Sequence, residues 1–248
     1  MIGGLLDHAE RQLGRSLRAA HVATLVRNQC DRVIGYHFAP SDHGSKNGED
    51  WLIEHLAPDT FVDVGANVGD WTAAVLERVP NAQGALIEPG AAAVARLHDR
   101  FADRVRIIAA AAGDAEGELR FYEQANAGEH SSLLPGVVSG GVERRVPIVT
   151  VDSLDLERID LLKIDVEGFD ARVLRGATRM LSEHRIGAVQ FEYNHPWIAA
   201  GDTLAGAVAF LAAAGYDTFA LRPGWLERFD LGRWGEFFCY SNFVALPR

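Results

Sequence analysis

Short apolar runs alternate along most of the chain with stretches in which apolar residues recur every three or four positions. A short apolar run is typical of a buried strand, and the longer spacing is typical of a helix with one buried face. The predicted strands are residues 61–64, 85–88, 105–109, 161–164 and 188–192. The predicted helices are residues 71–78, 91–101, 170–181 and 203–214. This alternation predicts an α/β protein with a doubly wound, mostly parallel sheet that is covered by helices on both faces.

The N-terminal part of the chain departs from this alternation. Apolar residues at helical spacing in residues 5–28 predict one or two amphipathic helices, which could cap the domain, cover a substrate or form a dimer contact. Residues 39–48 have the composition of a loop, and a short helix is expected over residues 49–57. We therefore divide the chain into an N-terminal helical extension, residues 1–47, and a main domain, residues 48–248.

The middle and the C-terminal end add β-structure of another kind. Residues 118–122 and 146–151 predict strands, the first of them antiparallel. Residues 123–145, between them, are rich in glycine, serine and charge, and long surface segments of this kind are often functional. Residues 216–221 and 240–246 predict an antiparallel pair of strands at the edge of the sheet.

Composition and charge narrow the classes of partner. The chain has 248 residues, of which 48% are hydrophobic, and a formal net charge of −10. Because no Lys- or Arg-rich run is present, nucleic acid is not expected as a partner. Cys30 and Cys239 lie far apart, which favours reduced thiols and a cytoplasmic protein. No apolar run of about 18 residues predicts a membrane span, and the N-terminus reaches charge too early for a signal peptide.

Residues 61–69 carry the most informative motif, a strand, a glycine turn and the start of a helix. Gly65 and Gly69 are spaced G-x-x-x-G, whereas a dinucleotide site favours G-x-G-x-x-G. Asp63, two residues before the first glycine, would repel a pyrophosphate but suits the ammonium and sulfonium charges of S-adenosylmethionine. Asn67 is either a turn residue or a cofactor contact, and the whole motif could also be a plain turn with a capping acid.

Acids after the next two strands extend this cofactor hypothesis. Glu88 follows the second strand, at a place and spacing where an acid accepts hydrogen bonds from ribose hydroxyls. Its structural alternative is a helix cap before Pro89. Asp114, after the third strand, could meet the adenine or could be an ordinary turn residue.

A second charged motif lies at the end of the strand over residues 161–164. Alternation places Lys163, Asp165 and Glu167 on one side of the chain, where unpaired burial of charge would be costly. They could form an internal salt bridge. Alternatively, Asp165 and Glu167 stand where cofactor and substrate meet.

Four residues are candidates for catalysis. Glu192 and His195 follow the next strand and would overhang the same cleft, where His195 could take a proton from a hydroxyl. His130, on the long polar segment, is the rival base, although each histidine could be plain surface. Asp165 completes the set, as an acid beside the reactive methyl group.

Together these motifs resemble the FkbM family of S-adenosylmethionine-dependent methyltransferases. The resemblance runs from about Gly48 to the C-terminus and is most specific in residues 62–69, 131–133, 162–168 and 173–177. It implies a class I methyltransferase fold, which is Rossmann-like. The likeness of Gly48-Glu49 to the family's lead-in implies that Glu49 lies near the amino-acid end of the cofactor. Asp170 stands where the family has a second glutamate, and residues 108–112 lack the asparagine often found there.

The family resemblance implies O-methylation of a sugar or secondary-metabolite hydroxyl, hence a small-molecule acceptor. A variant that uses Mg²⁺ would take Asp165, Glu167 and Glu192 as oxygen ligands, but it is not favoured and no metal ligand is assigned. The alternatives are a nucleotide-dependent sugar-modifying oxidoreductase or epimerase, and a non-catalytic module that binds the cofactor. A homodimer through the N-terminal helices is a further expectation.

Overall fold

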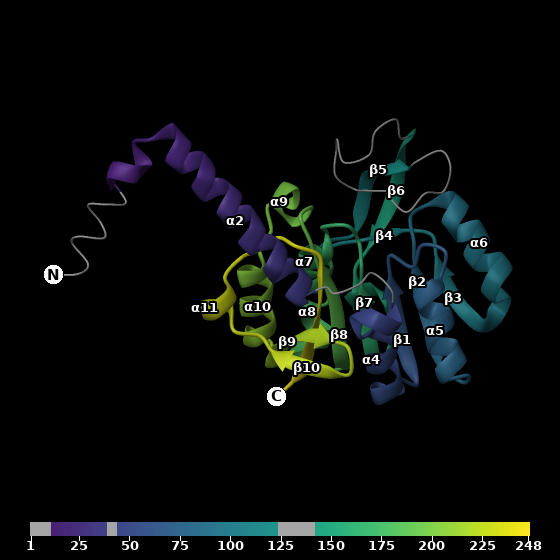
Figure 1. Cartoon of the computed structure of the whole chain (residues 1–248). Coiled ribbons are helices and arrows are strands. Elements are labelled where there is room, and N and C mark those ends of the chain that lie inside the picture. The colour runs from purple at the N-terminus through teal and green to yellow at the C-terminus, as the bar shows by residue number, and fades with distance from the viewer. Residues whose placement is uncertain (1–10, 39–43, 124–141) are drawn as a thin grey trace.

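The computed structural model describes residues 11–38, 44–123 and 142–248, and its centre is an eight-stranded sheet (Figure 1). The strand order is β10-β9-β11-β8-β7-β1-β2-β3. The strands of this sheet are β1 (Thr60–Val64), β2 (Gln83–Ile87), β3 (Val105–Ile108), β7 (Ile159–Ile164), β8 (Ile186–Tyr193), β9 (Tyr216–Arg222), β10 (Trp225–Arg228) and β11 (Ser241–Pro247). The neighbouring strands β3, β2, β1, β7 and β8 all pair in parallel, which confirms the predicted mostly parallel sheet.

Helices cover both faces of this sheet, as the alternation of strands and helices predicts. The α-helices from residue 44 onward are α3 (Gly44–Asn47), α4 (Glu49–Leu56), α5 (Asp70–Arg78), α6 (Ala91–Phe101), α7 (Asp170–Arg175), α8 (Thr178–Ser182), α9 (Trp197–Ala200), α10 (Leu204–Ala213) and α11 (Leu231–Trp234). Apolar residues of α4, α5 and α6 form one buried cluster with Phe61 and Leu161. Those of α7, α8 and α10 form another with Val62 and Leu162. Successive strand residues therefore enter opposite layers of the core.

The C-terminal strands pair as predicted, with one strand added. β11 lies antiparallel between β8 and β9, so the expected antiparallel pair β9–β11 is present at this end of the sheet. β10, which the sequence pattern did not predict, pairs antiparallel with β9 and forms the outermost strand.

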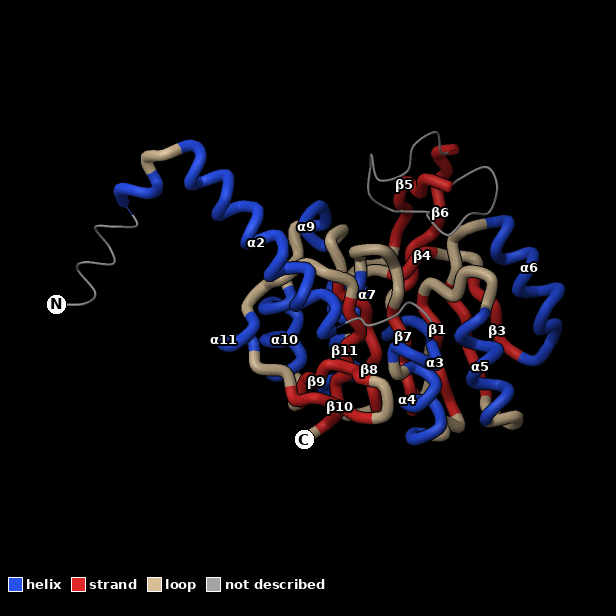
Figure 2. Tube along the Cα trace, in the orientation of Figure 1, coloured by secondary structure: helices blue, strands red, loops and turns tan. Residues whose placement is uncertain are grey.

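A second, three-stranded sheet was not predicted as a separate unit. It has the order β4-β6-β5 and is formed by β4 (Ala111–Ala112), β5 (Gly117–Glu123) and β6 (Val142–Val149). β5 and β6 are antiparallel, as expected for residues 118–122, and Figure 2 shows both standing out from the main sheet. Most of the long polar segment, residues 124–141, lies outside the described residues.

Two expectations for local structure are wrong. The single helix expected over residues 170–181 is divided into α7 and α8 around Gly176. A Cβ atom on Gly176 would lie 2.0 Å from the carbonyl oxygen of Gly113, so the chain passes too close to that loop for a regular helical side chain. Within the loop expected over residues 39–48, residues 44–47 form α3.

The N-terminal helix α2 (Leu17–Phe38) ends at Phe38, beyond residue 28, where the predicted helical pattern ends. It projects from the main domain, as Figure 1 shows, and Phe38 at its C-terminal end is its one buried residue. Phe38 stacks on Phe237, with 4.5 Å between the ring centroids, and also contacts Trp234. An aromatic cluster at the C-terminal end of the chain therefore anchors the helix.

Candidate functional site

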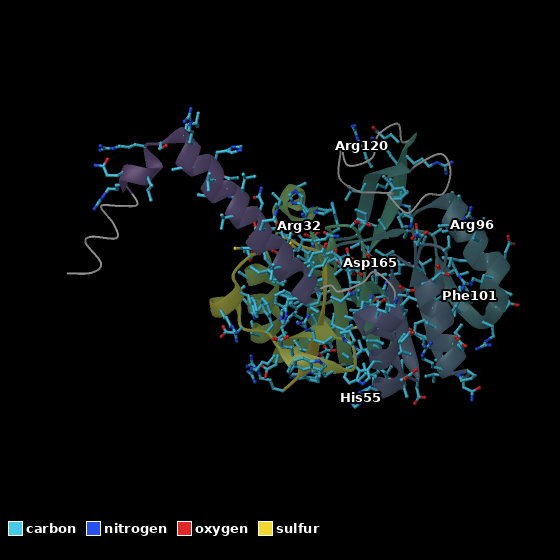
Figure 3. The ribbon with its side chains drawn as sticks, in the orientation of Figure 1. Arg32, His55, Arg96, Phe101, Arg120 and Asp165 are labelled. Carbon is cyan, nitrogen blue, oxygen red and sulfur yellow. The ribbon has the colours of Figure 1, made fainter. Side chains whose placement is uncertain are left out.

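Charged and amide side chains gather where the parallel strands β1, β2, β7 and β8 end. Because carboxyl ends of parallel strands share one edge of the sheet, this edge is where α/β proteins bind ligands. Figure 3 places Asp165, just after β7, near the middle of the molecule. We call the acids around it the acidic cluster, which consists of Glu49, Asp63, Asp165, Glu167, Asp170 and Glu192.

Lys163 is the buried cation of this region. Its Nζ atom lies 3.1 Å from Oδ2 of Asp165 and 3.7 Å from Oδ1 of Asp63. Burial alone would lower the pKa of Lys163, but the charges of Asp165, Asp63 and Glu49 together raise it above its ordinary value. The lysine is therefore fixed in its charged form, and the internal salt bridge considered for the β7 motif is present.

Asp63 is enclosed by protein. Its side chain is fully buried, and Oδ2 accepts a 2.7 Å hydrogen bond from the hydroxyl group of Thr72. With Thr72 and Lys163 as neighbours, the carboxylate of Asp63 faces protein groups rather than open space. The direct cofactor contact suggested by the sequence for Asp63 stays a prediction.

Glu49 joins α4 to β8 at the same edge. Its Oε1 atom accepts a 2.6 Å hydrogen bond from Nε2 of Gln190, and Oε2 accepts one of 3.0 Å from Nδ2 of Asn47. Gln190 is buried, and its own Oε1 atom has no hydrogen-bond partner. An unpaired buried acceptor carries a desolvation cost, so this atom is suited to receive a donor from a ligand.

Glu192 lies two residues further along β8 and is also buried. Its Oε1 atom accepts a short hydrogen bond from Nδ2 of Asn194, and Oδ1 of Asn194 has no partner although it is buried. Burial first, and then the charges of Asp165, Asp170 and Glu167, raise the pKa of Glu192 well above its ordinary value. Glu192 is thus a carboxyl group that can hold a proton more readily than a surface glutamate.

Asp170, at the start of α7, fixes the backbone of this region. Its carboxylate accepts hydrogen bonds from the backbone N–H groups of Gly168 and Glu192, each at 3.3 Å. It is fully buried, and burial together with the charge of Asp165 raises its pKa well above the ordinary value.

The glycine turn after β1 is shaped by close contacts inside the protein. Gly65 has φ of 81°, and a Cβ atom there would lie 1.9 Å from the carbonyl oxygen of Asp165. A Cβ atom on Gly69 would lie 2.3 Å from the ring of Phe101. Both glycines therefore let protein segments approach each other, which is a different reason from the close ligand approach that the motif suggested.

Glu88 braces this turn from the end of β2. Its Oε2 atom accepts a 2.9 Å hydrogen bond from the backbone N–H of Asn67, and Oε1 accepts one of 2.7 Å from the backbone N–H of Gly90. Asn67 itself adopts a left-handed conformation with φ of 48°. The predicted cofactor residues Asn67 and Glu88 are thus brought together and held in a fixed orientation.

The three remaining predicted residues are either exposed or outside the described part of the chain. His195 is exposed in the turn after β8. Asp114 is exposed, and its carboxylate lies 3.8 Å from Nε of Arg175. His130, and with it residues 131–133 of the family resemblance, lies outside the described residues.

The sequence reasoning missed several residues of the site. Gln190 stands two residues before Glu192 and Asn194 two residues after it, so in an extended chain all three lie on the same side. This alternation could have identified both residues from the sequence. Tyr240 precedes β11, and burial and the negative charges of Glu192, Glu49 and Asp165 raise the pKa of its hydroxyl group. No local pattern marks Tyr240, because the fold alone brings the C-terminal segment to this edge.

Two further observations concern metal ligands and membrane-spanning helices. Within residues 11–38, 44–123 and 142–248, no three histidine, cysteine, aspartate or glutamate side chains are arranged to hold a metal ion. Over the same ranges, no helix has both the length and the apolar character needed to cross a bilayer.

Comparison with known proteins gives one family and a set of similar folds. The family model described as the methyltransferase FkbM domain matches residues 63–218, and no curated protein matches the sequence. The solved structure of a methyltransferase FkbM from Methylobacillus flagellatus KT is 17% identical with a TM-score of 0.51. That match covers 77% of this chain but 44% of the other, so the chain spans less than half of that structure's length.

A second solved structure is a TehB-like SAM-dependent methyltransferase from Corynebacterium glutamicum ATCC 13032 Kitasato. It is 13% identical with a TM-score of 0.47, and the match covers 91% of this chain and 100% of the other. At such identities, the likeness to the first of these two structures indicates a shared fold and nothing narrower.

Proposed function

The chain belongs to the methyltransferase FkbM family, and from this membership we propose that it transfers a methyl group from S-adenosylmethionine to a hydroxyl oxygen of a sugar or secondary-metabolite acceptor. Its main sheet is the Rossmann-like sheet of a class I methyltransferase. The observation that supports this reaction best is the acidic cluster around Lys163, at the carboxyl ends of β1, β7 and β8.

The charges of the site fit S-adenosylmethionine better than a dinucleotide. The ammonium group of Lys163 interacts with four carboxyl groups of the acidic cluster, those of Asp165, Asp63, Glu49 and Glu192. A ligand with sulfonium and ammonium charges would be attracted to this arrangement, whereas a pyrophosphate would be repelled. The unpaired acceptor atoms of Gln190 and Asn194 add places for ligand donors. The same charges count against the oxidoreductase alternative.

Particular residues would hold the cofactor. Glu88 would accept hydrogen bonds from the ribose hydroxyl groups, since it follows β2 and the backbone N–H groups of Asn67 and Gly90 orient its carboxylate. Glu49 and Gln190, together with Asp165, would hold the amino-acid end. Asp63 supports them by keeping Lys163 in place.

The acceptor needs a group that takes its proton. S-adenosylmethionine supplies an electrophilic methyl group on a sulfonium when it is bound. Glu192 can take the proton of the acceptor hydroxyl, because its raised pKa makes its carboxylate a stronger base than an ordinary glutamate. Asn194 holds the carboxylate of Glu192 in one orientation by donating to Oε1. His195 and His130 remain rival bases.

Calorimetry with S-adenosylmethionine, its demethylated product and NAD tests the cofactor assignment. We expect binding of the first two and none of NAD, and the variant Glu88→Ala should bind the first two at least about tenfold more weakly because it loses the ribose contacts. Glu77→Ala, which removes an exposed side chain of α5, is the matched control. Binding of NAD without S-adenosylmethionine would overturn the proposal.

Methyl transfer itself requires a separate measurement. The protein is incubated with methyl-labelled S-adenosylmethionine and a panel of sugars and polyphenols, and labelled products are analysed by mass spectrometry and nuclear magnetic resonance. We expect a methyl ether on oxygen. Cofactor binding without transfer to any compound of the panel would favour the non-catalytic binding module, and a product methylated on nitrogen would contradict the proposed acceptor class.

A further inference from the structure

One face of α2 carries large apolar residues that are mostly exposed. Val22, Val26, Val33 and Tyr36 have exposed fractions of 58%, 58%, 69% and 66%. Together with Gln29 they recur at intervals of four and three residues, which is the spacing of the contact positions in a coiled coil. We call these five residues the α2 seam.

The opposite face of α2 is already used by its own main domain. Phe38 is buried there and Ile34 packs against the same core, while the thiol of Cys239 lies 3.8 Å from the carbonyl oxygen of Asp31 and would be met by a Cβ atom on Gly35. At about 100° per residue, these inward positions and the α2 seam lie on opposite sides of the helix. The seam therefore points away from the domain, and Figure 3 shows side chains around the projecting helix reaching into solvent.

The charge of α2 is opposite to the charge of the rest of the protein. Residues 11–38 contain five arginines and one aspartate, in a chain with a formal net charge of −10. Arg18 continues the seam toward the N-terminus, and Arg11 and Arg15 precede the first residue of α2. A partner for this surface would combine a matching apolar stripe with an acidic surface beside it, and a second copy of this chain provides both.

We propose that α2 pairs with α2 of a second copy through the α2 seam, in antiparallel orientation, to form a two-fold symmetric dimer. Antiparallel pairing places Val22 opposite Val33 of the partner subunit and brings Arg15 and Arg18 toward the acidic main domain of the partner. A two-fold axis through the helix pair makes both halves of the contact identical. In this register Gln29, the polar residue of the seam, lies opposite Val26 of the partner subunit. The dimer does not depend on the proposed methyl transfer.

Sedimentation equilibrium of the full chain over a wide dilution series tests the dimer. The wild-type protein should dimerise, and the double variant Val26→Glu/Val33→Glu should raise the dissociation constant about 100-fold or more, because it places carboxylates in an apolar contact. The matched control Thr24→Glu/Asn28→Glu adds the same charges to exposed positions of α2 outside the seam, and it should remain dimeric. Circular dichroism checks that α2 stays helical in both variants.

Two further measurements separate this dimer from other uses of α2. High salt should weaken the wild-type dimer, since the arginines of α2 face an acidic partner. Gln29→Leu should tighten it. A wild-type protein that is monomeric throughout, or a Val26→Glu/Val33→Glu variant that dimerises like the wild type, would overturn the proposal. So would a monomer that floats with phosphatidylglycerol vesicles, since the occupant of the seam would then be a lipid surface.

Discussion

The ammonium group of Lys163 lies 3.7 Å from the carboxylate of Asp63, and both side chains are buried between the central strands β7 and β1. The two residues are direct neighbours in the sheet, because the register pairs them across the β1–β7 ladder. Asp63 of the glycine motif is thus an ion-pair partner of Lys163 in the second charged motif. This pairing keeps Lys163 beside Asp165, at the edge where the site forms.

Removing the carboxylate of Asp63 should destabilise the fold. Asp63→Ala removes one of the buried carboxylates that pair with the ammonium group of Lys163. Breaking a buried ion pair in this way lowers the free energy of unfolding by about 3–5 kcal/mol. Urea denaturation measures the change. The matched control is Glu54→Ala, which removes an exposed partner of Arg78 and should cost no more than about 1 kcal/mol. Equal losses in the two variants would show that Lys163 does not need Asp63.

The tight approach between the glycine turn and β7 gives a second prediction. Gly65→Ala places a methyl group 1.9 Å from the carbonyl oxygen of Asp165, so the turn must move away from β7. Gly201 provides the comparison, because its φ of 74° is similar to the 81° of Gly65 but a Cβ atom there would meet nothing within 4 Å.

Gly201→Ala should therefore cost only the strain of a left-handed residue, about 1–2 kcal/mol. Gly65→Ala should cost more in urea denaturation and should also weaken binding of S-adenosylmethionine, because Asn67 and Glu88 are attached to the same turn. If both variants lose the same free energy of unfolding, the contact with Asp165 is unimportant.

The sequence pattern predicted the parts of the fold that depend on local periodicity. The parallel strands and most helices follow from apolar spacing, and the residues at the ends of β1, β2 and β7 were found because strand ends share one edge. The break between α7 and α8 was missed, because it comes from the contact of Gly176 with Gly113, far away in the sequence.

Long-range contacts also explain what was missed in the site. Lys163 could be paired with an acid from the sequence, but its pairing with Asp63 depends on the register of β1 against β7. Tyr240 enters the site because β11 inserts between β8 and β9, which no periodicity reveals. His195 follows the same strand end but is exposed in the turn after β8, and its catalytic role stays a prediction.

The raised pKa of Glu192 predicts how the stability of the protein varies with pH. In the folded state burial holds a proton on Glu192 at a pH where the unfolded chain has released it. The folded state then binds more protons, so this group makes the free energy of unfolding fall as pH rises from the ordinary glutamate pKa through the raised one. Asp170, whose pKa is raised in the same way, adds to the fall.

Glu192→Gln should remove its part of this dependence, so the variant should gain stability relative to the wild type as pH rises above the ordinary glutamate pKa. Urea denaturation at a series of pH values measures the difference. Glu77→Gln, with a side chain that is 83% exposed, should follow the wild-type curve. A Glu192→Gln variant that loses stability relative to the wild type as pH rises would have the wrong sign for a raised pKa.

The identity of the base can be decided from the pH dependence of kcat, once a methylated acceptor is known. If Glu192 takes the proton, kcat should rise with pH through its raised pKa and level off once its carboxylate is fully formed. Glu192→Gln should then lower kcat by about 100- to 10,000-fold and flatten the profile. His195→Gln and His130→Gln are the comparisons, and both should keep the wild-type profile. Loss of the pH dependence in either histidine variant, with Glu192→Gln still active, would assign the base to that histidine and leave Glu192 as a binding residue.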